Sequence, residues 1–145
     1  MCKPFIGKKG FKLPIIHELP EAEEVVVLRA EAGLSPQSPS AVERALHHSL
    51  FVACARDEHN KLLGTGRVIG DGVYHFQIVD IVVRSDCRDS SVVHELLEEL
   101  IDYVDRNAEQ DANLVVISDL EAMKLYAKHG FELMYPNFYG MSRKL

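Results

Sequence analysis

The chain has 145 residues, which suits one domain spanning residues 1–145. Its net charge of −6 argues against a nucleic-acid-binding protein and favours cationic partners such as amines. No apolar run is long enough to cross a bilayer, and no signal peptide is visible, so we expect a cytoplasmic protein with no membrane partner. The three cysteines lack metal or redox spacing, so we expect them to be reduced thiols.

The first third of the chain predicts a short strand followed by two helices. Residues 11–18 contain a short β-like run. Residues 21–32 predict a helix, because acidic residues fill a first turn where the helix dipole favours them. Ser38 or Ser40 then caps a shorter helix that runs to about His48.

Three strands follow in quick succession, over residues 50–56, 62–69 and 73–83. Polar or glycine-rich turns separate them, which is typical of antiparallel hairpins. In the third and longest strand, the period of two predicts that alternate residues share one face if no bulge intervenes. That face would carry Tyr74, Phe76, Ile78, Asp80 and Val82.

The C-terminal half predicts a helix, a short buried strand, a second helix and two closing strands. The first helix carries an apolar stripe of period 3.6, formed by Val93, Leu96, Leu97, Leu100, Ile101 and Val104. Residues 114–117 predict the buried strand, Ser118 or Asp119 caps the next helix, and residues 131–134 and 138–144 predict the closing strands. This order predicts an α/β or α+β fold with a central mixed sheet covered by helices.

Residues 78–100, read as IVDIVVRSDCRDSSVVHELLEEL, organise the chain. An apolar strand runs through a polar loop into an acidic amphipathic helix, so the helix N-terminus offers free N–H groups and a positive dipole end to a phosphate. The stretch resembles motif A of the GNAT superfamily of N-acetyltransferases, where such a loop and helix hold the acetyl-CoA pyrophosphate. The match includes Asp80 and residues 88–93, but Ser91 and Val93 replace the family's glycines.

Five stretches resemble members of the same superfamily, in the same order along the chain. They are the helical pair at residues 28–46, the hairpin at 49–72 with its GRVIGDG turn, the strand at 76–83, the LYAKHGF signature at 125–131 and the P-x-x-x-G-M closing strand at 136–141. The GNAT fold that this resemblance implies has a central, mixed but mostly antiparallel sheet flanked by helices. Two parallel strands are splayed apart at its cofactor site.

The resemblance implies an acetyl-CoA-dependent N-acetyltransferase that acts through a ternary complex. Acetyl-CoA would lie between the splayed strands at residues 79–83 and 114–117, and a primary amine of a small molecule or peptide would attack its thioester. A backbone N–H near Ile81 or Val82 would stabilise the oxyanion. Because free alkyl amines have pKa values near ~10, a base or another path for the proton is required.

Tyr126 and Asp80 are the candidate catalytic residues. By the resemblance, Tyr126 protonates the departing CoA thiolate; the alternative is a tyrosine that only packs against the sheet. Asp80 lies in an otherwise apolar strand face, where burial would raise its pKa towards that of a general base. The alternative is a structural carboxylate bonded to Arg67 or to backbone donors. His75 is a second candidate base.

The resemblance places the cofactor against the central strand, the loop and the helices that follow, at Ile81, Val82, Val83, Arg88, Asp89, Ser90, Ser91, Val92, Val93 and Asp119. Arg88 would contact the pyrophosphate, whereas the carboxylate of Asp89 would repel it. Ser90 and Ser91 can cap the helix, and Asp119 is first of all a helix cap. Val93 either blocks the ligand or fills the core.

Two functions remain open from the sequence. One is the active N-acetyltransferase; the other is a degenerate member of the fold that binds CoA weakly or not at all and serves as a binding or regulatory protein. The signature around Tyr126 and the presence of Asp80 favour the first, and Asp89, Ser91 and Val93 favour the second. An apolar last strand would permit a homodimer. No metal site is predicted, because His47 and His48 are adjacent and make no helical i, i+4 pair.

Overall fold

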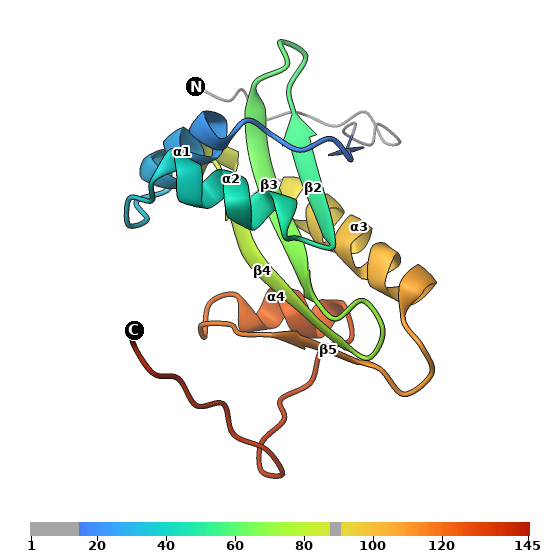
Figure 1. Cartoon of the computed structure of the whole chain (residues 1–145). Coiled ribbons are helices and arrows are strands. Elements are labelled where there is room, and N and C mark those ends of the chain that lie inside the picture. Colours follow the sequence, from blue (N-terminus) through green and yellow to red (C-terminus); the bar gives the residue numbers. More distant parts are fainter. Residues whose placement is uncertain (1–14, 88–90) are drawn as a thin grey trace.

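The computed structural model describes residues 15–87 and 91–145, and within them strands and helices are mixed along the chain (Figure 1). The strands are β1 (Ile15–Ile16), β2 (Phe51–Arg56), β3 (Leu62–Gly70), β4 (His75–Val83) and β5 (Asn113–Val116). The helices are α1 (Ala22–Glu31), α2 (Pro39–His47), α3 (Val92–Asn107) and α4 (Met123–Lys128), with a short 3-10 turn at Ser85–Cys87. Arg88, Asp89 and Ser90 therefore lie outside the described residues.

The described strands form one sheet in the order β1-β2-β3-β4-β5. Neighbouring strands are antiparallel except β4 and β5, which are parallel, so the predicted mixed and mostly antiparallel sheet is confirmed. Helix α3 packs on one face of the sheet, and α1 and α2 pack on the other (Figure 1). Among the described helices, none has the length and apolar character needed to cross a bilayer.

Local sequence explains where the first two helices begin. The Oγ of Ser38 accepts a hydrogen bond from the Ala41 N–H at 3.3 Å, so Ser38 rather than Ser40 caps α2. Pro39 fits the first turn of α2, because the N–H that proline lacks would be unpaired there. At α1, the Glu24 carboxylate accepts a hydrogen bond from the Glu21 N–H at 3.2 Å. Each cap satisfies an N–H that the helix itself leaves unpaired.

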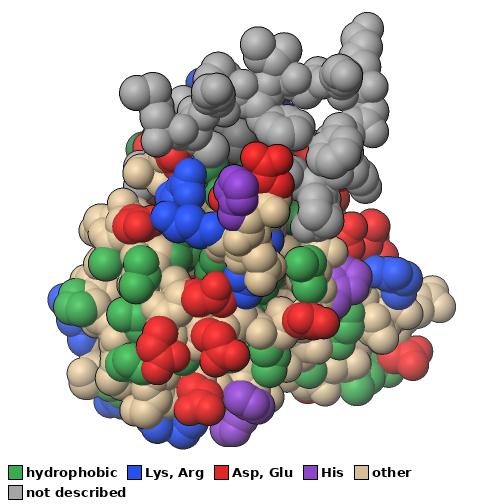
Figure 2. Space-filling view, turned by 90° about the horizontal axis from the view of Figure 1, so that it is seen from above, with side chains coloured by type: hydrophobic (Ala, Val, Ile, Leu, Met, Phe, Trp, Pro, Cys, Tyr) green, Lys and Arg blue, Asp and Glu red, His purple; other side chains and the backbone are tan. Residues whose placement is uncertain are grey.

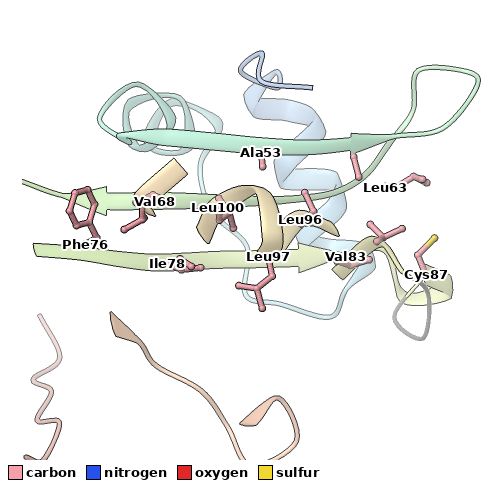
Figure 3. Close-up of a cluster of buried hydrophobic side chains, with 13 residues drawn as sticks. Ala53, Leu63, Val68, Phe76, Ile78, Val83, Cys87, Leu96, Leu97 and Leu100 are labelled. Carbon is pink, nitrogen blue, oxygen red and sulfur yellow. The ribbon is translucent and has the colours of Figure 1, made fainter. Parts of the chain in front are cut away.

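The larger core lies between α3 and the sheet. Leu96, Leu97 and Leu100 of α3 are 0% exposed and pack against strand residues such as Val68 and Phe76 (Figure 3). Removing one leucine side chain from water contributes roughly 1.5–3 kcal/mol, so this helix face anchors the fold. The predicted stripe is confirmed at its centre, while its members at residues 93 and 101 are only partly buried.

A smaller core lies on the opposite face, between the sheet and helices α1 and α2. Its buried members are Ala22, Val25, Leu28, Val42, Leu46, Val52, Cys54, Leu62 and Val82. Cys54 is 0% exposed, and this burial raises the pKa of its thiol. Cys87 is 3% exposed in the larger core, and both side chains are free thiols. Neither sulfur is therefore open to solvent.

A β-bulge in β4 changes which residues share a face. Residues 80 and 81 stand opposite the single residue Gly66 of β3. Phe76 and Ile78, before the bulge, lie in the larger core, whereas Val82, after it, lies in the smaller core. The prediction that these residues share one face is therefore wrong beyond Ile78, because one extra residue reverses the alternation.

The end of the chain also differs from the prediction. Residues 131–134 and 138–144 form no strand, and after α4 the chain runs away from the sheet (Figure 1). Its large apolar side chains are exposed, namely Leu133, Met134, Tyr135, Phe138, Tyr139, Met141 and Leu145. The residue pattern is typical of strands, but a strand needs a neighbour for its backbone hydrogen bonds, and no described strand pairs with this segment.

Candidate active site

The parallel strands β4 and β5 separate part of the way along β4. They are paired from His75 with Asn113 to Ile78 with Val116, and β4 then continues for five more residues, 79–83, without β5. Among the described residues, no strand pairs with this edge of β4. The edge therefore presents backbone N–H and C=O groups to a ligand, as predicted for the splayed strands.

The bulge at residues 80–81 lies within this open stretch of β4. Only a residue without a side chain fits at Gly66, opposite the bulge. A Cβ atom at that position would lie 2.8 Å from Leu100 Cδ1 and 3.2 Å from Ile81 Cγ1, closer than ordinary carbon contacts. Asp80 has a φ of +52°, a left-handed conformation that aspartate tolerates better than most residues. Bulges commonly re-aim side chains at functional sites, and this one turns Asp80 away from the larger core.

Asp80 is an ion-paired and partly exposed carboxylate. Its Oδ2 accepts hydrogen bonds from Arg67 Nε and Nη2 at 3.1 and 2.8 Å, and its Oδ1 lies 3.7 Å from Arg29 Nη1. The side chain is 42% exposed, so the predicted burial is wrong; the bulge is the physical reason. The contact with Arg67, predicted as the alternative for this residue, is present.

A small cavity lies beside Asp80, between α1, α2 and the sheet. Its volume is about 20 Å³, which is room for about one water molecule. The polar and charged groups that line it are Arg29, Gln37, Thr65, Arg67 and Asp80, and the other lining residues are apolar. The cavity thus joins the bulge of β4 to the two N-terminal helices.

Tyr126 of α4 is half-buried at the margin of the larger core. Its ring packs edge-to-face with Phe131, with ring centroids 5.7 Å apart. Burial raises the pKa of its hydroxyl, and the negative charge of Asp119 raises it further. The hydroxyl therefore stays protonated at neutral pH. Ile81 of the open edge also packs at the margin of the larger core.

The start of α3 bears on the predicted phosphate site. Val92 is 3% exposed, and Val93 packs against the larger core, which is the core-filling alternative predicted for Val93. The side chain of Ser91 makes no capping hydrogen bond, so the prediction that its side chain caps this helix is wrong. Its backbone carbonyl oxygen accepts a hydrogen bond from the Glu95 N–H at 2.9 Å. In the next turn, His94 Nδ1 and His129 Nε2 are 3.2 Å apart, which links α3 to the end of α4.

The remaining candidate residues have simpler positions. Asp119 Oδ1 accepts a hydrogen bond from the Ala122 N–H at 2.8 Å, so the predicted cap before α4 is confirmed. His75 is exposed at the first residue of β4, roughly 15 Å of strand away from Asp80, too far to act with it. Within the residues that the structure describes, no three His, Cys, Asp or Glu side chains are grouped as metal ligands.

The structure adds Arg29 and Gly66, which sequence reasoning missed as site residues. Arg29 follows buried Leu28 and lies four residues after buried Val25, so it shares the buried face of α1. A cation on that face is the signal that could have revealed it. Gly66 gave no comparable signal, because its role depends on a neighbouring strand and on α3.

Comparisons with known proteins agree with this geometry. A family model described as an acetyltransferase (GNAT) domain matches residues 20–141. A crystal structure from meticillin-resistant Staphylococcus aureus, of a protein of unknown function described as a probable acetyltransferase, is 34% identical with a TM-score of 0.84 and covers 92% of this chain and 100% of that one. No curated protein matches the chain.

Two more distant structures share the fold. An acetyltransferase of the GNAT family from Streptococcus pneumoniae is 20% identical, has a TM-score of 0.77 and covers 92% of this chain and 98% of that one. A glucosamine-6-phosphate N-acetyltransferase from Arabidopsis thaliana is 15% identical, has a TM-score of 0.70 and covers 92% and 99%. At these identities the structural similarity shows a shared fold and nothing further.

Proposed function

Because the chain belongs to the GNAT family of acetyltransferases, we propose that it is an acetyl-CoA-dependent N-acetyltransferase acting on a primary amine of a small molecule or peptide. The observation that carries this proposal is the open edge of β4 beyond Ile78, next to the bulge at Asp80 and Ile81. The extended pantetheine arm of acetyl-CoA suits such an edge, because it can bond to the free N–H and C=O groups as an added strand would.

The transfer forms one bond and breaks another. The lone pair of a neutral amine attacks the thioester carbonyl, an N–C bond forms, and the C–S bond breaks as CoA leaves as a thiolate. A backbone N–H at Ile81 or Val82 stabilises the negative charge on the carbonyl oxygen. Tyr126 gives its phenolic proton to the thiolate sulfur and recovers one from solvent. The phenol of Tyr126 is protonated at neutral pH, so the proton is available, and the raised pKa means that it leaves only when a strong base such as a thiolate forms beside it.

The amine must also lose a proton. Asp80 is the carboxylate at the bulge, and its 42% exposure lets an incoming ammonium group reach it. Arg67 holds Asp80 in place through two hydrogen bonds. In this proposal Asp80 binds the ammonium and accepts its proton directly or through water as the nitrogen attacks.

The start of α3 supports binding of the CoA phosphates. The Val93 side chain packs against the core, so its branched carbons are directed to the sheet side of the helix. The positive end of the helix dipole then remains for an anion.

Calorimetric titration with acetyl-CoA and with CoA is the first test, and micromolar binding is expected. Release of CoA thiol is then measured over a panel of primary amines. Tyr126→Phe should lower kcat by about 100-fold with unchanged acetyl-CoA affinity, because it removes only the proton donor. Tyr74→Phe, at a 51%-exposed tyrosine just before β4, is the matched control. Absence of binding at millimolar acetyl-CoA would overturn the proposal.

A second candidate is the degenerate member that serves as a binding or regulatory protein. Ser91 in place of a glycine favours it, because an added side chain keeps the backbone farther from a phosphate. Ser91→Gly separates the two functions. If this change creates CoA binding that the natural chain lacks, the degenerate function is favoured; if strong binding is unaltered, it is rejected.

A further inference from the structure

Arg29 is a buried guanidinium with unmet hydrogen-bond donors. Its side chain is 12% exposed, and among the described residues its Nε has no hydrogen-bond partner. Its Nη1 lies 3.7 Å from Asp80 Oδ1, which is longer than a hydrogen bond. Arg67, in the same cavity, donates to Asp80, to the Ala45 carbonyl and to Ser49 Oγ. A buried N–H group without an acceptor is unfavourable, so the Nε of Arg29 calls for an acceptor in addition to the ion pair with Asp80.

The charge of the cavity points to the same need. Two guanidinium groups, Arg29 and Arg67, face one carboxylate, Asp80, so the lining carries one net positive charge. The chain as a whole is acidic, with a net charge of −6, and Asp and Glu side chains gather on the face seen from above (Figure 2). The cavity lining therefore differs in sign from the chain as a whole.

The position and size of the cavity define the anion. The cavity includes Asp80 at the bulge, where the proposed function places the acceptor amine. Its volume of about 20 Å³ is room for about one water molecule, so one carboxylate oxygen can enter it with the other oxygen outside, whereas a phosphate group is too large. An anion bound here would be separated from the amine by only a few covalent bonds.

We propose that the acetyl acceptor is an amino-acid-like compound whose carboxylate binds Arg29 and whose amine lies at Asp80. Arginine suits this role because its planar N–H groups match the two oxygens of a carboxylate. This inference rests on the proposed function and narrows its acceptor from any primary amine to a zwitterion with neighbouring amine and carboxylate.

The test compares acceptors that differ only in the carboxylate. The pairs are phenylalanine with phenethylamine, histidine with histamine and lysine with cadaverine, and O-phosphoethanolamine supplies the phosphate arm. The natural chain should show a kcat/KM at least ~10-fold higher for the reactive amino acid than for its amine. Arg29→Gln should lower kcat/KM for the amino acid by about 10- to 100-fold more than it lowers kcat/KM for the matched amine. Arg44→Gln, at an exposed arginine of α2, is the matched control.

Binding is measured separately from acetyl transfer. Amino acids and their matched amines are titrated into the full chain by NMR, with Arg29→Lys as the variant that keeps charge but loses the planar fork. If acetyl-CoA binds and both members of each pair react equally, the carboxylate inference is overturned while the proposed function stands. If acetyl-CoA does not bind, the NMR titration decides: amino-acid binding lost in Arg29→Gln supports the carboxylate site. Absence of amino-acid binding, or a preference for the phosphate arm, overturns it.

Discussion

Replacing Gly66 by alanine tests whether the bulge depends on the absence of a side chain. The new Cβ would lie 2.8 Å from Leu100 Cδ1 and 3.2 Å from Ile81 Cγ1, well inside the ordinary carbon contact of about 3.5–4.0 Å. Leu100 is 0% exposed and cannot move into solvent. Overpacking of this kind costs about 1–3 kcal/mol, partly offset by about 0.4–1 kcal/mol from the stiffer unfolded chain.

We therefore expect Gly66→Ala to lower the free energy of unfolding by about 1–2 kcal/mol in a urea titration, or Tm by about 2–8 °C. Gly140→Ala, where nothing lies within 4 Å, should lower neither, because only the small gain from the stiffer unfolded chain applies there. Adding Leu100→Val to Gly66→Ala should recover part of the loss, because it removes the carbon that collides. Equal stability of Gly66→Ala and Gly140→Ala would refute the reasoning.

Three further predictions concern stability. Leu97→Ala, at a 0%-exposed residue of the larger core, should lower the free energy of unfolding by about 2–5 kcal/mol in urea, and a loss below ~1 kcal/mol would contradict the described core. Arg29→Met should leave that free energy unchanged or raise it, since it removes unmet buried donors; a loss above ~2 kcal/mol would mean that the native contacts already satisfy Arg29. The hydrogen bond from Arg56 lowers the pKa of Glu24 below 4.5, so this pair contributes stability above pH 4.5 that is lost as the pH falls through the lower folded value. Glu24→Gln should therefore lower Tm at pH 7, with a difference that shrinks under acid in calorimetry.

The sequence predicted the elements whose signal is local. The leucines of α3 repeat with period 3.6, and each is buried as that period requires. Ser38 and Asp119 cap helices because a side-chain oxygen followed by a helical run is a local pattern. The antiparallel strands followed from short turns between apolar runs. These features depend on neighbours a few residues apart, so one sequence is enough to predict them.

The features that the sequence did not reveal depend on contacts between distant segments. The exposure of Asp80 follows from a bulge opposite Gly66, and nothing within β4 itself marks where the extra residue lies. The unmet donors of Arg29 appear only when α1, α2 and the sheet enclose one cavity. The prediction of the closing strands was wrong for the same reason, since a strand pattern at residues 138–144 does not specify which strand will pair with it.

The burial of Cys54 and Cys87 makes these two side chains poor substrates for thiol chemistry while the chain is folded. The thiolate is the reactive form, and the raised pKa of Cys54 reduces its share at neutral pH. The two sulfurs also lie inside the two cores, so a reagent can reach them only when the structure opens locally or unfolds. A chromogenic disulfide that reports released CoA would therefore react with the product and not with these side chains. Hydrogen peroxide would likewise leave both reduced for as long as the chain stays folded.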